Sequence, residues 1–207
     1  MKNWIFIEAK DKRTPEAQFL HTILAKYFPD KEYDFICMDG EANLKKEANI
    51  SHFQSHTDEG DNCLCIMDAD TLAKGWGFAK RSSDVAEFRQ TNGLSFELFL
   101  YPDNATDGDV EMLMESLVRR DLHATVFDCF EDYEACVGGK KDAAGNPVYN
   151  TPNRKGKLHT YINAIKLNKA QRDKLGSGQW RFDDPDLWDL TRNELQPLLE
   201  FFKMNLK

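Results

Sequence analysis

Short apolar runs alternate with helical patterns along the first half of the chain. Four runs rich in apolar residues predict buried strands, at 3–8, 32–39, 62–68 and 94–102. The stretches between and after them predict helices from apolar residues at helical spacing or from weak helical character, at 14–28, 41–56, 82–92 and 107–120. Strands that alternate with helices form βαβ crossovers. The predicted fold is therefore α/β, with a Rossmann-like, mostly parallel sheet flanked by helices.

The second half of the chain is less regular. Residues 123–130 predict either a further short strand or the start of a helix that runs through Cys136. Residues 138–156 have no periodicity and are rich in Gly, Pro and Asn, which is typical of a flexible loop. A basic helix and an apolar packing helix are predicted to follow. We therefore expect a core, a flexible loop and a C-terminal helical extension that packs on the core, at 1–137, 138–157 and 158–207.

Length and composition indicate the size of the domain and the compartment of the protein. The 207 residues suffice for one substantial domain. The first apolar run is too short for a signal peptide, and no run approaches the roughly 20 apolar residues of a membrane helix. The five cysteines form no framework, which favours reduced thiols. We expect a cytoplasmic protein with no membrane partner.

Charge is unevenly distributed along the chain. The net charge of −8 argues against a protein coated in nucleic acid, because binding to the phosphate backbone depends on Lys and Arg. Residues 154–174, however, hold seven basic residues and one acid. We expect this segment either to be a solvated helix face or to bind nucleic acid. The candidate nucleic-acid ligands are Lys155, Lys157, Lys166 and Lys169.

Acidic residues follow the predicted strands at the edge where a parallel sheet binds ligands. Glu8 ends the first strand, Asp68 ends the third, and Asp70 lies just beyond it. Unpaired carboxylates repel one another, so a proton or a cation is expected between them. Oxygen ligands of this kind suit Mg²⁺ or Mn²⁺. A single Asp after a strand is often only a turn residue or a helix cap, but three acids at one edge favour a metal site.

Further acids begin the predicted helix after the fourth strand. Asp107, Asp109 and Glu111 lie in its first turns, where the helix dipole favours acids without any ligand. Glu111 is therefore only a weaker candidate for the same site.

Three stretches together resemble the Toprim fold, which type IA topoisomerases, bacterial primases and the overcoming-lysogenization-defect nucleases share: "IFIEAK", "CIMDAD" and "FLYPDNATDGDVEMLM". Glu8 matches the family glutamate, and Asp68 and Asp70 match the family Asp-x-Asp. The later segments "DCFEDYEAC", "KGKLHTYINA" and "LWDL…LQPLLEFF" are similar to a Toprim-related family of uncharacterised bacterial and archaeal proteins. The chain departs from the pattern at Ala9, where the family has Gly. The nearest further acids are Asp11 and Glu16.

The resemblance implies Mg²⁺-dependent phosphodiester chemistry. It implies that Glu8, Asp68 and Asp70 hold one ion and that Glu111 contributes to a second. Lys157 is the candidate lysine that assists phosphoryl transfer, with Lys155 as an alternative. No Ser, Tyr or Cys stands out as a nucleophile, which favours hydrolysis over the strand passage of topoisomerases.

Two other classes of function remain open. "CIMDADTL" is similar to the DxDxT motif of haloacid-dehalogenase-type phosphatases, in which Asp68 would be the nucleophile and Asp70 the acid/base. That motif normally lies on the first strand, and Glu8 would then have no role. Alternatively, the domain is a non-catalytic module of a defence or toxin–antitoxin system. Such a module would bind a partner protein or a second copy of itself.

Overall fold

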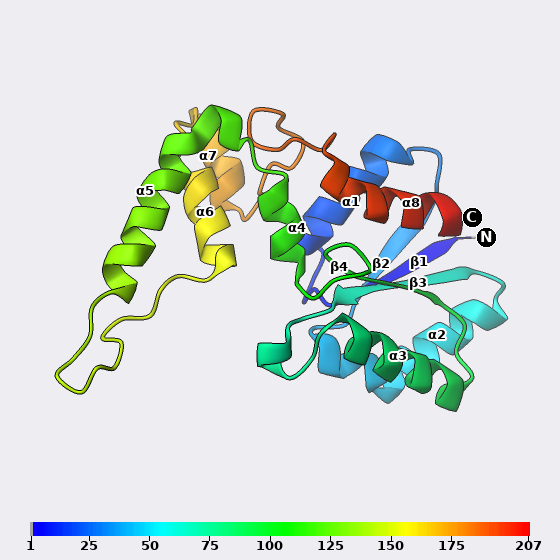
Figure 1. Cartoon of the computed structure of the whole chain (residues 1–207). Coiled ribbons are helices and arrows are strands. Elements are labelled where there is room, and N and C mark those ends of the chain that lie inside the picture. The colour runs from blue at the N-terminus through cyan, green and yellow to red at the C-terminus, as the bar shows by residue number, and fades with distance from the viewer. Residues whose placement is uncertain (1) are drawn as a thin grey trace.

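The computed structural model describes residues 2–207 and contains a parallel sheet of four strands (Figure 1). The strands lie in the order β2-β1-β3-β4. Their bounds are Asn3–Ile7 for β1, Tyr33–Cys37 for β2, Asn62–Asp68 for β3 and Glu97–Tyr101 for β4. All three strand pairs are parallel. The predicted α/β class is confirmed, and the carboxyl ends of β1 and β3 are neighbours.

Helices cover both faces of the sheet (Figure 1). Alternate residues of a strand point to opposite faces, so Ile5 and Ile7 belong to one apolar core and Phe6 to the other. The first core includes α1 and α8, and the second includes α2 and α3. Phe6 is fully buried, and its ring stacks on that of Phe53 with centroids 3.6 Å apart. The bounds of these helices are Pro15–Tyr27, Gln196–Asn205, Glu47–Asp58 and Phe78–Asn92 for α1, α8, α2 and α3.

The start of α1 follows from local sequence. The Thr14 side chain accepts a hydrogen bond from the backbone N–H of Ala17 and caps the helix. Pro15 occupies the first turn, where its missing N–H leaves no bond unmade. The predicted helix at 14–28 is confirmed. Its first turn lies just after the loop that leaves β1, which brings Glu16 to the carboxyl edge of the sheet.

Several elements differ in extent from the prediction. The helix predicted at 82–92 begins earlier, at Phe78, and the strand predicted at 94–102 spans only 97–101. The helix predicted at 107–120 is the short α4, Val110–Ser116. Residues 123–130 belong to a helix, α5, Arg120–Gly138. The short 3₁₀ helices are η1 at Glu41–Lys45, η2 at Leu72–Lys74 and η3 at Asn193–Leu195.

The basic segment 154–174 forms two helices instead of one. They are α6, Arg154–Ala164, and α7, Lys169–Gly176. The break occurs where the Asn168 side chain accepts from the Gln171 N–H and the Gln171 side chain accepts from the Asn168 N–H. This reciprocal capping box starts a new helix at Lys169.

Helices α5, α6 and α7 form an arm beside the sheet (Figure 1). We call residues 120–176 the arm. Phe127 of α5 packs on Tyr161 of α6 with ring centroids 5.0 Å apart, and both residues are buried. The C-terminal extension expected at 158–207 thus has two parts. Its first helices lie in the arm, and α8 lies on the sheet, where Phe201 contacts Phe99.

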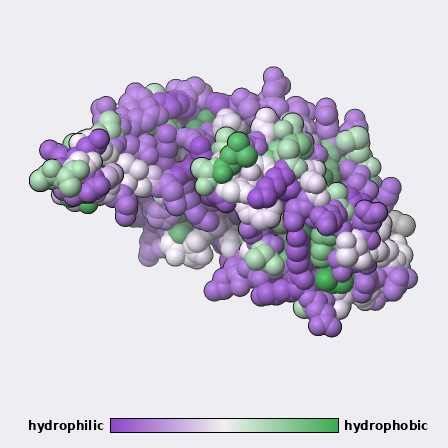
Figure 2. Space-filling view, turned by 60° about the horizontal axis from the view of Figure 1, so that its bottom comes forward, coloured by the Kyte–Doolittle hydropathy of each residue, from purple (hydrophilic) through white to green (hydrophobic). Residues whose placement is uncertain are grey.

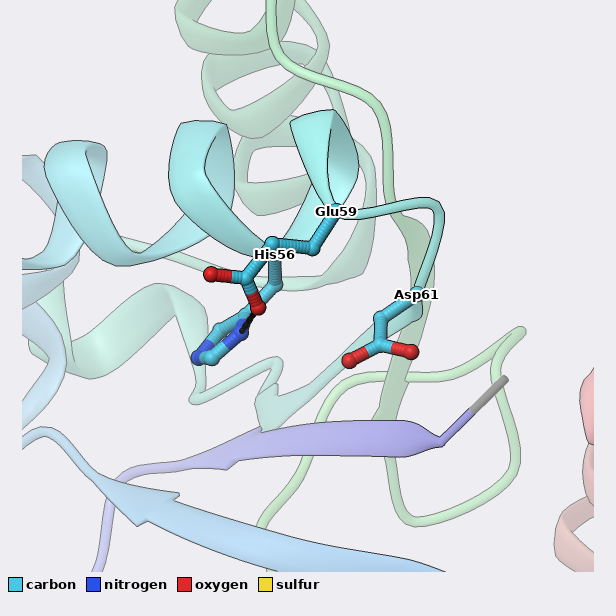
Figure 3. A group of neighbouring side chains, drawn as sticks. All are labelled: His56, Glu59 and Asp61. Carbon is cyan, nitrogen blue, oxygen red and sulfur yellow. Dashed lines mark ion pairs between the residues drawn. The ribbon is translucent and has the colours of Figure 1, made fainter.

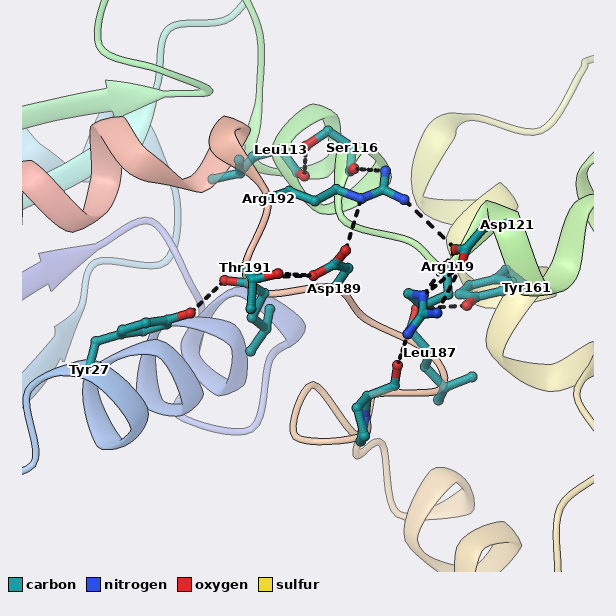
Figure 4. Close-up of polar contacts among 12 residues, drawn as sticks. Tyr27, Leu113, Ser116, Arg119, Asp121, Tyr161, Leu187, Asp189, Thr191 and Arg192 are labelled. Carbon is teal, nitrogen blue, oxygen red and sulfur yellow. Dashed lines mark hydrogen bonds and ion pairs between the residues drawn. The ribbon is translucent and has the colours of Figure 1, made fainter.

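Residues 185–192 connect the arm to the sheet domain (Figure 4). The hydroxyl of Tyr161 in the arm donates to the Leu187 carbonyl at 2.7 Å. The hydroxyl of Tyr27 in α1 donates to the Leu190 carbonyl, also at 2.7 Å. Further bonds join this connecting segment to α4 and to the start of α5, namely Asp189 N–H to Leu117 O, Arg192 Nη1 to Ser116 O and Arg119 N–H to Leu187 O. The segment therefore fixes the arm against α1 and α4.

The surface is largely hydrophilic on the face that Figure 2 shows, with hydrophobic side chains in small, separate groups. None of the helices in residues 2–207 combines the length and the apolar character that crossing a membrane requires.

Candidate acidic site

Glu8 and Asp68 lie side by side at the carboxyl edge of the sheet. Glu8 directly follows β1, and Asp68 is the last residue of the neighbouring β3. One carboxylate oxygen of Glu8, Oε1, accepts a hydrogen bond from the Asp68 N–H at 3.1 Å. Asp68 Oδ1 accepts from the N–H of Val110, the first residue of α4, at 2.8 Å. The two acids thus meet beside the start of a helix.

Glu16 is a third acid of this group. It lies in the first turn of α1, and the negative charges of Asp68, Glu8 and Glu111 all act on it. Burial, and then these charges, raise the pKa of Glu16 well above its ordinary value. Asp11, the other acid after Glu8, instead pairs with Arg13 at 2.9 Å at the surface. The further acid that the sequence left open is therefore Glu16.

The environment of these acids favours their neutral forms. Burial raises the pKa of Glu8 to about 7. Burial, followed by the charge of Glu8, raises the pKa of Asp68 well above its ordinary value. Several carboxylates in one partly buried group are stable only when protons or a cation balance their charge. We call Glu8, Asp68 and Glu16 the acidic cluster.

Tyr101 adds a buried hydroxyl next to the acidic cluster. It pairs in register with Asp68 and is fully buried, and its hydroxyl has no hydrogen-bond partner among the described residues. Burial, and then the charges of Glu16, Asp68 and Glu8, raise the pKa of Tyr101 well above its ordinary value. Buried polar groups normally find a partner in protein, water or a ligand. The three carboxyls of the acidic cluster are the oxygen donors that Mg²⁺ and Mn²⁺ prefer, so their chemistry suits such an ion.

Asp70 forms ion pairs with two cations, and its charge also acts on Glu8. Its backbone has a positive φ of 59°. One oxygen, Oδ1, accepts from Lys74 Nζ at 2.7 Å, and Oδ2 accepts from Arg81 Nη2 at 2.9 Å. The like charges of the Asp-x-Asp pair are therefore separated, and two cations balance the charge of Asp70.

Arg81 is the buried partner in this arrangement. Only 3% of the residue is exposed. Its guanidinium also pairs with Glu41 and lies 3.8 Å from the centre of the Trp76 ring. Burying a guanidinium requires such partners, since each unpaired charge is costly. Arg81 thus joins α3 to the end of β3.

The loop that carries Asp70 is joined to Gly108 by two backbone hydrogen bonds. The Asp70 N–H donates to Gly108 O at 2.6 Å, and the Gly108 N–H donates to Asp70 O at 2.9 Å. Gly108 has a φ of +155°, and a Cβ there would lie 2.5 Å from Met112 Sδ and 2.9 Å from Pro102 Cδ. Only glycine fits this position without a shift of its neighbours.

Replacing Gly108 by Ala is expected to lower the free energy of unfolding by about 1–3 kcal/mol, because the methyl group collides with Met112 and Pro102. Urea unfolding measures this change. Gly60→Ala is the matched control, since Gly60 has a φ of +78° and a Cβ at this position would have no atom within 4 Å. An equal loss in both variants would show that backbone strain alone, and no collision, sets the effect.

Ala9 occupies the position after Glu8 where the Toprim family has Gly. It is buried and is not among the residues with positive φ. Alanine therefore fits this turn.

Glu111 and the lysines predicted beside it lie on the arm side of the acidic cluster. Glu111 is half-buried, and its charge acts on Asp68 and Glu16. Lys155 Nζ lies 3.4 Å from Glu111 Oε1. Lys155 is therefore an ion-pair partner of α4.

Lys157 does not contact Glu8, Asp68 or Asp70. Its side chain is 13% exposed, and its ammonium lies 2.9 Å from Glu115 and 3.4 Å from Glu131. The lysine that contacts the Asp-x-Asp pair is Lys74, which no sequence motif singled out. Its spacing of four residues from Asp70 was the available signal, although the intervening residues form only a 3₁₀ turn.

The candidate nucleic-acid ligands divide into two groups. Lys155 and Lys157 are paired with acids of α4 and α5. Lys166 and Lys169 are exposed, and no ion pair within residues 2–207 includes them. The basic character of 154–174 is thus partly balanced within the arm.

A second group of ligand-type side chains lies at the opposite edge of the sheet (Figure 3). His56, Glu59 and Asp61 each offer a ligand atom within 4.8 Å of the others. Asp61 also accepts hydrogen bonds from the backbone N–H of Lys2 at 2.8 Å and from Trp4 Nε1 at 2.9 Å. These bonds give Asp61 a structural role at the start of β1. In residues 2–207 neither the trio of Glu8, Asp68 and Asp70 nor the acidic cluster forms a group this close.

Comparisons of the chain with protein-family models, with curated proteins and with solved structures found no match. The Toprim resemblance therefore stays a prediction from the motif residues. The side chains of the site are the basis for assigning a function.

Proposed function

We propose that the protein is a Mg²⁺- or Mn²⁺-dependent hydrolase of phosphodiester bonds. The observation that carries this proposal is the meeting of Glu8 and Asp68 at the carboxyl edge of β1 and β3. Glu16 and the unpartnered hydroxyl of Tyr101 complete a partly buried group of oxygen donors. Ligands of open parallel sheets bind at this edge.

The residues of the site have separable roles in this proposal. Glu8 and Asp68 would hold the ion, with Asp70 as a third ligand that exchanges Lys74 for the metal. Glu111 would contribute to a second ion. When bound, the metal supplies an activated water and stabilises negative charge on the phosphate. Lys74 then lies beside the site and offers a positive charge to the phosphate oxygens.

Calorimetric titration of Mn²⁺ tests the proposal. Wild-type protein is expected to bind, and Asp68→Asn and Glu8→Gln are expected to weaken binding at least tenfold, since each removes a charged ligand. Asp11→Asn is the matched control, because Asp11 is a nearby acid at the surface that pairs with Arg13. A screen of DNA and RNA cleavage in Mn²⁺ follows, with the same variants. Equal affinity in all four proteins would contradict the proposed ligand set.

A second candidate is a non-catalytic module that binds a partner protein or a second copy of the chain. The observation that favours it is the ion pairing of both Asp70 oxygens with Lys74 and Arg81. Wild-type protein that binds no Mn²⁺ and cleaves no nucleic acid would support this alternative. If Glu8→Gln still binds Mn²⁺ and the protein hydrolyses a phosphate monoester, the haloacid-dehalogenase-type phosphatase would be supported instead.

The setting proposed for this activity is the cytoplasm, with nucleic acid as the partner. All five cysteines are free thiols in the structure, and a reducing compartment keeps thiols in this state.

A further inference from the structure

A cleft lies between α1 and the residues that follow α7. Its volume is about 580 Å³. Lys12 and Arg13 line it from the loop before α1, and Lys174 and Arg181 line it from the other wall. Asp183 is the acid in the lining. A concentration of four cations in one cleft is unexpected in a chain with a net charge of −8.

Most cations of the cleft are paired with acids. Three of them pair with acids that do not line the cleft, namely Lys12 with Asp34, Arg13 with Asp11 and Arg181 with Asp184. Lys174 is exposed and takes part in no ion pair within residues 2–207. The three paired acids and Asp183 formally offset the four cations, so Lys174, the cation without an ion pair, is the one available to attract an anion.

Arg181 is the most deeply placed of these cations. Its side chain is 10% exposed. Nη2 pairs with Asp184, whereas Nη1 is buried and has no hydrogen-bond acceptor among the described residues. A buried donor without a partner is costly. The planar guanidinium fork is suited to phosphate oxygens.

The walls of the cleft are held in place before any ligand binds. Gln18 of α1 donates from Nε2 to the Gly178 carbonyl at 2.8 Å, and its Oε1 accepts from the Trp180 N–H at 3.0 Å. This pair of bonds fixes the loop after α7 to α1. A preformed site loses less entropy when a ligand binds.

An apolar hollow adjoins the cationic cleft. Its volume is about 510 Å³, and it shares His21, Thr22, Phe182 and Asp183 with the cleft. Trp188 and Leu190 extend it along α1. The two hollows together present positive charge at one end and apolar surface at the other. A nucleotide unit has the matching order of phosphate and planar base.

We propose that the cleft between α1 and the 177–183 loop binds a phosphate group, held by Lys12, Arg13, Lys174 and Arg181. The phosphate belongs either to a free nucleotide or to a nucleic-acid strand, and the adjoining apolar hollow receives the nucleoside next to it. This site is separate from the acidic cluster and requires no metal. It gives the basic segment 154–174 a role through its last residue, Lys174.

Isothermal titration in EDTA tests the site with three probes: pyrophosphate, adenosine monophosphate and a 5′-phosphorylated oligonucleotide of eight thymidines. Lys174→Glu and Arg13→Glu change opposite walls at exposed positions, so folding should be retained, and circular dichroism checks this. Each variant is expected to weaken binding about tenfold, because an attractive charge becomes repulsive. Lys203→Glu on α8 is the matched control, with the same charge change at an exposed position outside the cleft.

The outcomes separate this site from the proposed hydrolase. Asp68→Asn, which removes a ligand of the acidic cluster, is expected to bind the probes like wild type even if no cleavage is ever detected. Tighter binding of the oligonucleotide than of the monophosphate assigns the phosphate to a strand, and equal binding assigns it to a free nucleotide. Absence of binding by wild type, or equal weakening by Lys203→Glu and Lys174→Glu, overturns the proposal.

Discussion

Replacing Arg81 by Met is expected to lower the free energy of unfolding by about 3–5 kcal/mol. The guanidinium is buried between Asp70 and Glu41, so its removal leaves Glu41 without its cation and Asp70 with Lys74 alone. Met retains much of the apolar stem, so the loss reports the guanidinium, with its ion pairs and its contact with the Trp76 ring. Urea unfolding at pH 7 measures the change.

Two further variants provide a control and a rescue for Arg81→Met. Lys80→Met removes a cation from the same helix that is exposed and also lies over Trp76, and it is expected to cost less than about 1 kcal/mol. Adding Glu41→Gln to Arg81→Met is expected to restore part of the loss, because the charge of Glu41, which has lost its cation, disappears. A loss below about 1 kcal/mol for Arg81→Met would mean that Glu41 finds another partner and that Lys74 suffices for Asp70.

In EDTA, the stability of the protein is expected to fall as the pH rises from about 4.5 to 8. The pKa of Glu8 is about 7 in the folded protein, against an ordinary value of 4.5. The folded state therefore binds the Glu8 proton more tightly than the unfolded state does, and the stabilisation present at low pH is lost as the pH rises through 7. This difference of pKa corresponds to about 3 kcal/mol. The raised pKa values of Asp68 and Glu16 act in the same direction.

Urea unfolding at pH 5 and pH 8 measures this dependence. Glu8→Gln cannot ionise, so it is expected to lose less stability than wild type between the two pH values. Glu194→Gln, at an exposed position, is the control and is expected to behave like wild type. Equal stability of wild type at both pH values would show that the Glu8 carboxyl is not buried as it is in the structure. If the acidic cluster is a metal site, Mn²⁺ restores stability at pH 8 more than at pH 5.

The sheet and its first helix could be predicted from sequence because their signals are local. Thr14 and Pro15 mark the start of α1, and the apolar runs mark the strands. The segment 123–130 was ambiguous, since Val126, Phe127 and Phe130 suit a strand or a helix. Burial of Phe127 and Phe130 from one face of α5 agrees with helical spacing.

The break in the basic segment also has a local signal in the sequence. Asn168 and Gln171 have the spacing of a capping box, which marks a new helix start. A single helix over 154–174 was therefore the wrong expectation. The position of the arm beside the sheet, in contrast, depends on contacts between residues far apart in sequence, such as Tyr161 with Leu187. No local sequence pattern predicts it.

Sequence also placed Glu8 and Asp68 at one edge, because neighbouring parallel strands end together. It could not predict the direction of the Asp70 side chain. That direction follows from a left-handed backbone at Asp70 and from Arg81, which comes from a helix eleven residues further along the chain. The ion pairs of Lys157 could not be predicted from sequence either, because its partners Glu115 and Glu131 lie on two other helices.

Helix α1 belongs to the acidic cluster and to the phosphate cleft at once. Glu16 is part of the cluster, whereas Gln18, His21 and Thr22 line the cleft. A helix rises about 1.5 Å per residue and moves as a rod, so a displacement of α1 carries both groups of side chains with it. Occupancy of one site that moves α1 must therefore change the affinity of the other, and by thermodynamic reciprocity the effect is the same in both directions.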